Sequence, residues 1–171
     1  MNHTIYLGLG SNVGERRKFL GAALEALPPK VHFLRKSSLY ETAPWGFEQQ
    51  GDFLNVVVEA QTDLSPQELL DYLKDVESMV GREASFKNGP RQIDIDILFY
   101  DDLVLEEEGL VVPHPRVHAR SFMLAPIVEL TPELVHPVFG KTVSELLALA
   151  GTAGIKGKTP WNLNSETTNN K

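Results

Sequence analysis

Two aspartates alternate with isoleucines in the segment IDIDIL, residues 93–98. In a β-strand, residues two apart share a face, so Asp94 and Asp96 lie on one side, with their Cα atoms roughly 6.5 Å apart. The isoleucines and Phe99 are expected on the other side, buried in the core. At an effective dielectric near 20 the two carboxylates repel by roughly 3 kcal/mol, so a cation must offset the cost.

Two magnesium ions would supply that positive charge. Asp94 and Asp96 would hold them together with the phosphates of a substrate. The alternative is an exposed strand face on which the aspartates meet only solvent or a lysine.

Basic residues cluster near the aspartates in the sequence. Arg82, Lys87 and Arg91 precede them, and only Glu83 opposes this charge. Arg120 adds a further guanidinium after the segment PHPRVHAR. Guanidinium groups bind phosphate through two parallel hydrogen bonds, so this combination suits phosphoryl transfer. Taken singly, each arginine also fits an ordinary solvated surface position.

The glycine-rich segment GLGSNVG, residues 8–14, follows a strand pattern. Its spacing does not match the dinucleotide-binding motif, because Val13 stands where the third glycine is required. We therefore expect a tight strand-to-helix turn.

His114 and His118 are four residues apart, which on a helix is the spacing of metal ligands. The prolines on both sides of His114 disfavour a helix there, so a zinc pair is the weaker interpretation. In an extended turn, His114 could instead donate a hydrogen bond to a phosphate.

The segment ETAPWGFEQQGDFLN, residues 41–55, is rich in proline, glycine and aromatic residues. Trp45, Phe47 and Phe53 could belong to the core. They could equally stack on a flat heterocycle whose edge Asn55 would bind through hydrogen bonds. The sequence pattern leaves both interpretations open.

Composition limits the classes of protein to consider. The chain has 171 residues, 42% of them hydrophobic, which is enough for one compact domain. A net charge of −7 disfavours binding to nucleic acid or to anionic membranes, and the absence of cysteine excludes thiolate chemistry. The sequence has no signal-peptide pattern and no apolar run of membrane-spanning length. We expect a cytoplasmic monomer that binds small molecules, without nucleic-acid or membrane partners.

Hydrophobic periodicity predicts strands that alternate with helices. Neighbouring strands joined without a helix imply antiparallel pairing, so we predict an α+β fold: a ferredoxin-like antiparallel sheet with helices packed on it in three αβα layers. Residues 1–155 are expected to form the domain, and the polar residues 156–171 a mobile tail. The expected elements are strands at 4–10, 53–62 and 93–99, helices at 14–27, 64–81, 120–130 and 142–151, an irregular extended segment at 31–42, and a short extended pair within 101–115.

The order of several short motifs resembles the 6-hydroxymethyl-7,8-dihydropterin pyrophosphokinases of folate biosynthesis. The resemblance covers roughly residues 4–150, and its most specific part is the pattern PRxxDxDxL within GPRQIDIDIL. It implies transfer of the pyrophosphoryl group of ATP to the hydroxymethyl oxygen of the pterin, with release of AMP. The motifs are GLGSN (8–12), YETAPWG (40–46), FLNVVV (53–58), GR (81–82), GPRQIDIDIL (89–98), VPHPR (112–116) and RSFMLAP (120–126).

The same resemblance implies a role for each matching residue. Asp94 and Asp96 would bind two Mg²⁺ ions that bridge the phosphates of ATP, the co-substrate. Arg82 and Arg91 would be catalytic, and Phe53 and Phe122 would sandwich the pterin ring. The implied ATP contacts are Glu77, Arg82, Arg91, Ile97, His114 and Arg120, and the implied pterin contacts are Thr42, Pro44, Trp45, Phe53, Asn55 and Phe122.

The chain departs from the family pattern in the segment 81–90, which we expect to form a lid over ATP. Ala84 and Asn88 stand where the family often has arginine and tryptophan. Lys87 can replace part of the missing positive charge.

Two other functions fit some of these features. A metal-dependent phosphohydrolase could use Asp94, Asp96 and His114. A non-catalytic RNA-binding module could use a ferredoxin-like sheet, although the acidic composition and the lack of an aromatic RNA-binding strand motif oppose it.

Overall fold

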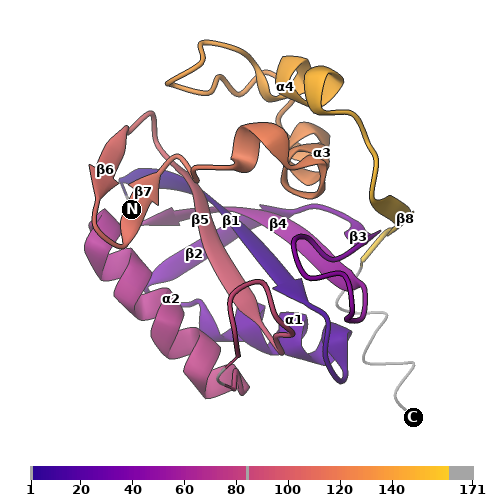
Figure 1. The fold of residues 1–171 in the computed structure, drawn as a ribbon. Coiled ribbons are helices and arrows are strands. Elements are labelled where there is room, and N and C mark those ends of the chain that lie inside the picture. The colour runs from indigo at the N-terminus through magenta and orange to yellow at the C-terminus, as the bar shows by residue number, and fades with distance from the viewer. Residues whose placement is uncertain (1, 84, 162–171) are drawn as a thin grey trace.

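The fold is a six-stranded antiparallel sheet between two pairs of helices (Figure 1). The structure is a computed structural model that describes residues 2–83 and 85–161. One pair of helices covers each face of the sheet, which confirms the predicted three-layer α+β architecture. The helices are α1 (Arg16–Ala26) and α2 (Pro66–Val80) on one face, and α3 (Ser121–Leu130) and α4 (Val143–Ala150) on the other.

The strands follow the order β5-β1-β4-β3-β8, and β2 also pairs with β4. All these pairings are antiparallel. The segment 31–42, expected to be irregular, contains two strands that both pair with β4. The bounds are β1 (His3–Ser11), β2 (Val31–Lys36), β3 (Leu39–Thr42), β4 (Phe53–Thr62), β5 (Asp94–Tyr100) and β8 (Ile155–Thr159); the small hairpin β6 (Leu105–Glu107) and β7 (Leu110–Val112) and the turn η1 (Val117–Ala119) precede α3.

Local sequence signals define α2 at both ends. Ser65 accepts a hydrogen bond from the Glu68 backbone, Glu68 returns one to Ser65, and Pro66 occupies the first helical position. Gly81 follows the last turn with φ of 120°, a conformation that favours glycine. α2 therefore ends before the segment that leads to β5, which begins at Asp94. None of the helices in the described part of the chain is long and apolar enough to cross a membrane.

A β-bulge divides β5 into two parts. The isoleucines of IDIDIL pack in the core under α1 and α2, as predicted. Phe99, predicted beside them, packs instead with Leu98 in the core under α3 and α4. The register with β1 explains the difference, because Leu7 pairs with Ile97 and Tyr6 with Phe99, which leaves Leu98 as the extra residue.

The prediction of a tail from Lys156 is wrong for the described part of that segment. Residues 155–159 form β8, which pairs with the edge strand β3. Trp161 is buried in the core on the α1 side. The prediction took the polar composition as a sign of mobility. The composition instead reflects an edge strand, because most residues of β8 are exposed. Residues 162–171, the rest of the predicted tail, lie outside the described residues.

The segment around β8 also contacts the loop 43–52. Gly154 accepts a hydrogen bond from the Ala43 backbone at 2.8 Å. At the other end of that loop, Lys156 Nζ lies 2.9 Å from Asp52 Oδ2. The loop is therefore attached at both of its ends to the C-terminal part of the domain.

Candidate active site

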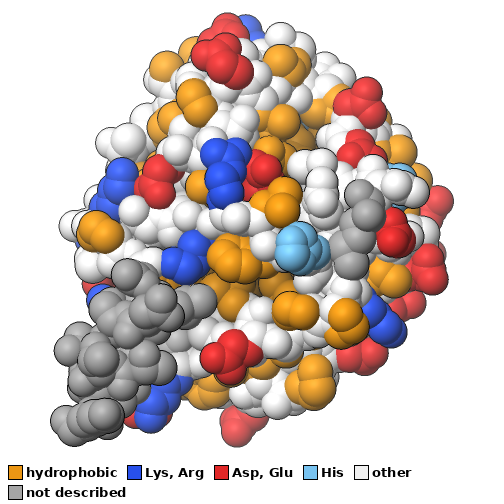
Figure 2. All heavy atoms as spheres, turned by 180° about the vertical axis from the view of Figure 1, so that it is seen from behind, with side chains coloured by type: hydrophobic (Ala, Val, Ile, Leu, Met, Phe, Trp, Pro, Cys, Tyr) orange, Lys and Arg blue, Asp and Glu red, His pale blue; other side chains and the backbone are white. Residues whose placement is uncertain are grey.

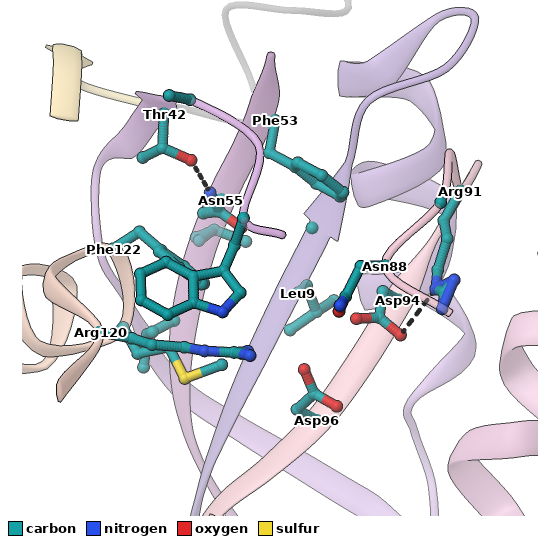
Figure 3. Close-up of a pocket in the computed structure, with 18 residues that line it drawn as sticks. Leu9, Thr42, Phe53, Asn55, Asn88, Arg91, Asp94, Asp96, Arg120 and Phe122 are labelled. Carbon is teal, nitrogen blue, oxygen red and sulfur yellow. Dashed lines mark hydrogen bonds and ion pairs between the residues drawn. The ribbon is translucent and has the colours of Figure 1, made fainter. Parts of the chain in front are cut away.

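A pocket opens where α3 and α4 leave the sheet uncovered. It encloses about 720 Å³, counted to its open mouth, and is lined by β1, β4, β5, α3 and the loops at 43–45 and 88–91. Figure 3 shows Phe122 across the pocket from Asp94 and Arg91, with Arg120 extending toward Asp96.

Two glycines form the floor of the pocket. Gly10 lies between Asn55 of β4 and Asp94 of β5, and Gly8 pairs with Asp96. A Cβ on Gly10 would lie only 2.8 Å from Asn55 Oδ1, so a larger residue would displace the amide. Both glycines belong to β1, as the strand predicted at 4–10 requires, and the turn predicted for GLGSNVG is confined to its end, where Gly14 has a φ of 71°.

The aspartates lie together on the pocket face of β5, as the alternation predicted. Loss of solvent, followed by repulsion from Asp94 and then Glu77, raises the pKa of Asp96 well above its usual value. Asp94 lies 3.3 Å from Arg82 Nη1, whereas Asp96 has no ion pair with any described residue. Of the two carboxylates, Asp96 is thus the one without a paired cation.

The donor set suits magnesium. Carboxylate oxygens are the ligands that Mg²⁺ prefers, and it usually takes one or two of them together with phosphates and water. Within residues 2–83 and 85–161, no third histidine or carboxylate completes a ligand set made of protein alone. The remaining coordination positions would thus belong to a phosphorylated substrate and to water.

Glu77 and Arg82 lie behind the aspartates and not in the pocket wall. Glu77 is 6% exposed and accepts hydrogen bonds from the Ile95 backbone at 2.8 Å and from Arg82 at 2.7 Å. Burial raises the pKa of Glu77, while these hydrogen bonds and the charge of Arg82 oppose the rise. Glu77 thus ties α2 to β5 and orients Arg82 toward Asp94.

Arg91 keeps part of its hydrogen-bonding capacity unused. Its Nη1 is buried and has no hydrogen-bond partner among the described residues, and its Nε lies 3.9 Å from Asp94 Oδ1. Its backbone is fixed by Asn12, which accepts from Arg91 N at 2.8 Å. Because buried donors are normally paired, the unpaired Nη1 points to an acceptor on a ligand, such as a phosphate.

Aromatic side chains and an amide form the opposite wall. The Arg120 guanidinium lies 5.2 Å from the ring centre of Trp45 and 5.5 Å from that of Phe122. Its Nε is buried without a hydrogen-bond partner in the described part of the chain. Asn55 Nδ2 donates to Thr42 Oγ1 at 2.6 Å, which fixes the amide at the pocket floor (Figure 3). A flat polar ring would therefore meet both stacking surfaces and an amide edge.

The pocket unites most, but not all, of the predicted site residues. Ile97 faces the core on the α1 and α2 side, and Pro44 lies between two lining residues without lining the pocket itself. The predicted residues in the lining are Thr42, Trp45, Phe53, Asn55, Arg91, Asp94, Asp96, Arg120 and Phe122.

His114 also lies outside the lining, beside the β-bulge. Its backbone donates to Leu98 O at 3.0 Å, and its Nδ1 accepts from Arg116 N at 3.1 Å. Burial, followed by the charges of Arg120 and Arg116, lowers the pKa of His114 to about 4. The imidazole is therefore neutral near pH 7, and since Nδ1 is an acceptor, Nε2 carries the proton as a donor.

Sequence reasoning missed several lining residues, among them Gly8, Gly10, Asn88 and Met123. Gly8 and Gly10 are two residues apart within TIYLGLG, so strand periodicity places them on one face. This spacing was the signal that could have identified them as pocket residues. Asn88 and Met123 reach the pocket through tertiary contacts that no local pattern encodes.

The side of the molecule seen from behind in Figure 2 bears on the RNA-binding alternative. In Figure 2, lysine and arginine side chains are scattered among acidic and apolar ones over the coloured part of that face. Proteins that bind nucleic acid gather such residues into a basic patch or stripe. This distribution opposes the RNA-binding interpretation.

Comparison with known proteins identifies the family. Residues 6–132 match the family model described as 7,8-dihydro-6-hydroxymethylpterin-pyrophosphokinase (HPPK). The chain is 49% identical to a 2-amino-4-hydroxy-6-hydroxymethyldihydropteridine pyrophosphokinase of Aquifex aeolicus, over 83% of this chain and 89% of that protein. A protein of the same name from Methylorubrum extorquens is 41% identical, over 88% of this chain and 96% of that protein.

Solved structures share the fold. The Plasmodium falciparum HPPK-DHPS wild type with pterin and p-hydroxybenzoate gives a TM-score of 0.69 at 18% identity. The similarity covers 86% of this chain but only 41% of that one, so the chain spans less than half the length of the structure. The matched family model, the two relatives and the observed fold agree with the motifs in the sequence. The chain therefore belongs to the 7,8-dihydro-6-hydroxymethylpterin-pyrophosphokinase family.

Proposed function

We infer that this chain catalyses the reaction after which its family is named: it transfers the pyrophosphoryl group of ATP to the hydroxymethyl group of 6-hydroxymethyl-7,8-dihydropterin in folate biosynthesis. One observation supports this most directly. Two carboxylates, of which Asp96 has no ion pair among the described residues, lie beside two guanidinium groups that each keep one unpaired nitrogen, and opposite an aromatic wall. A triphosphate and a flat heterocycle would each find complementary groups in this one pocket.

The pterin is proposed to bind at the aromatic wall. Phe53 and Phe122 would stack on its two faces, with Trp45 and Pro44 at the border. Asn55, held by Thr42, would bind the polar edge of the ring through its amide. The hydroxymethyl group would then point toward Asp94 and Asp96.

Asp94 and Asp96 are proposed to hold two Mg²⁺ ions. Bound there, the ions would neutralise charge on the phosphates of ATP. Arg91 and Arg82 would bind the transferred group, while Arg120 and His114 Nε2–H would add further phosphate contacts. Glu77 and Ile97 would act without touching the phosphates, by fixing the positions of Arg82 and of the β5 backbone.

Catalysis then rests on alignment and charge, without a covalent nucleophile. The hydroxymethyl oxygen attacks the β-phosphorus and gives up its proton to solvent, the bond from that phosphorus to the α-phosphate oxygen breaks, and AMP leaves with that oxygen. The half-buried guanidinium groups would stabilise charge that develops on the phosphate oxygens, with little reorganisation because contacts within the protein already position them.

An AMP assay tests this function. AMP should form when ATP and Mg²⁺ are supplied with 6-hydroxymethyl-7,8-dihydropterin, and not when the pterin is omitted. ATP or phosphoester hydrolysis that does not depend on pterin would favour the phosphohydrolase instead. We also propose that the enzyme is a monomer, because one chain supplies all of these groups, and light scattering of the purified protein would measure this directly.

A further inference from the structure

Two loops from different parts of the chain border the pocket. The pterin loop, residues 43–52, carries Trp45, and the arginine loop, residues 85–91, carries Arg91. They are far apart in sequence, so their relative position depends on tertiary contacts alone. Asn12, at the end of β1, contacts both.

The Asn12 amide is fully used by these contacts. Its Oδ1 accepts from Arg91 N at 2.8 Å, and its own backbone N donates to Arg91 O at 3.1 Å. Its Nδ2 donates to Gln50 Oε1 at 2.7 Å and to Gly51 O at 3.0 Å. Asn12 is only 8% exposed, so water offers little replacement for these partners.

Gln50 extends the connection across both loops. Its Nε2 donates to Phe47 O at 2.7 Å within the pterin loop and to Asn88 O at 2.6 Å in the arginine loop. Phe47 and Phe86 pack edge to face, with ring centres 5.0 Å apart. The two loops therefore form one connected unit with Asn12 at its base.

We propose that Asn12 is a positioning residue for pyrophosphoryl transfer, acting through Arg91 on one side and through Gln50 and the pterin loop on the other. It lines no part of the pocket, so it acts without touching substrate. The position needs both an acceptor and donors, which a carboxylate cannot provide. The inference rests on the roles proposed above for Arg91 and for the pterin wall.

Two substitutions at Asn12 separate its two connections. Asn12→Asp keeps the acceptor for Arg91 N and loses both donors to the pterin loop, so KM for pterin should rise at least about 10-fold while kcat changes less than about 2-fold. Asn12→Ala also loses the acceptor for Arg91 N, so kcat should fall a further ~10-fold. Gln50→Ala should reproduce the KM effect, and the double variant Asn12→Asp with Gln50→Ala should be no worse than either single one.

Gln92→Glu is the matched charge control. It adds the same negative charge near Arg91 but retains an acceptor for the Glu83 backbone, which Gln92 Oε1 now binds at 3.0 Å. It should leave KM for pterin unchanged.

Thermal unfolding of each variant must show a folded protein at the assay temperature, and if Asn12→Ala does not fold, Asn12→Asp and Gln50→Ala still decide the matter. A wild-type KM for pterin in both of those variants, or equal losses in kcat for Asn12→Asp and Asn12→Ala, would overturn the role of Asn12. Normal kinetics of Arg91→Ala and Phe122→Ala would instead overturn the proposed site roles.

Discussion

The sheet face that carries α3 and α4 consists of two halves with opposite character. Under the helices, β1, β4 and β5 present large apolar side chains, among them Tyr6, Val57 and Leu98. Beyond the helices the same strands present glycines, Asn55 and the aspartates. The open half, beyond the helices, is thus a continuation of the surface that forms the core in the covered half, and its polar groups are accessible because no helix lies over them.

The two halves also differ in energetics. Each large apolar side chain buried under the helices stabilises the fold by about 1.5–3 kcal/mol. In the open half, desolvation and repulsion from Asp94 raise the pKa of Asp96, so the charged pair destabilises the metal-free protein. The covered half supplies the stability that the open half lacks.

The largest expected effect comes from removing the carboxylates of the open half. Asp94→Ala or Asp96→Ala should lower turnover at saturating Mg²⁺ by at least about 10³-fold, because the phosphate charge would no longer be neutralised. In Mg²⁺-free buffer Asp96→Asn should raise Tm, because it removes the repulsion. The exposed Asp102→Ala is the control. Mg²⁺-dependent turnover at the normal rate in both alanine variants would contradict the metal assignment.

His114 tests the border between the halves, where its backbone meets Leu98. Its pKa is lowered from 6.5 to about 4, so the unfolded chain binds more protons than the folded one between these values. Stability should therefore fall by up to about 3 kcal/mol as pH drops from 6.5 to 4. His114→Gln should reduce this dependence in urea unfolding, and the remaining slope includes His136, whose pKa burial also lowers. An unchanged slope would show that His114 is not held neutral by the fold.

Arg91 tests whether the unused donors of the open half act on the reaction. Arg91→Ala should lower kcat by about 10²-fold with little change in Tm, because the group stabilises developing charge and makes few contacts within the protein. Arg91→Lys should recover only part of the loss, since it cannot bind phosphate in a bidentate manner. The control is Arg35→Ala on β2. Steady-state kinetics in which only KM rises would instead assign Arg91 to ground-state binding.

The glycines of the floor give the smallest and most local effect. Gly10→Ala should raise KM for pterin by about 10-fold, because its Cβ would press on Asn55 Oδ1. Gly157→Ala on β8 is the matched control, since Gly157 is also a strand glycine and a Cβ there would meet nothing within 4 Å. Equal KM values for the two variants would mean that Asn55 does not read the pterin edge.

Periodicity and short motifs were sufficient to predict most of the fold and much of the pocket. The alternation in IDIDIL placed Asp94 and Asp96 on one face, and the capping residues of α2 gave its start. The sequence pattern failed at Phe99, because a bulge depends on pairing with β1, which local alternation does not reveal. It placed Gly8 and Gly10 correctly in a strand but did not identify them as pocket residues, because a missing side chain leaves no chemical signal in the sequence.

The connections of Asn12 could not be read from the sequence for a different reason. Its partners Gln50 and Arg91 are remote from it in the chain. Nothing in the sequence around Asn12 or Gln50 distinguishes either amide from that of an ordinary surface residue. Only the fold brings them together. Contacts that depend on loop placement therefore mark the limit of prediction from one sequence.

The attachment of the loop 43–52 to the segment around β8 affects the entropy of substrate binding. Gly154 holds one end of the loop and Lys156 the other, although both residues lie beyond the part of the chain that matches the family model. A loop restrained in advance loses less conformational freedom when the pterin arrives, so more of the contact energy contributes to affinity. A polar C-terminal strand, remote from the chemistry, thereby lowers the entropic barrier to recognition.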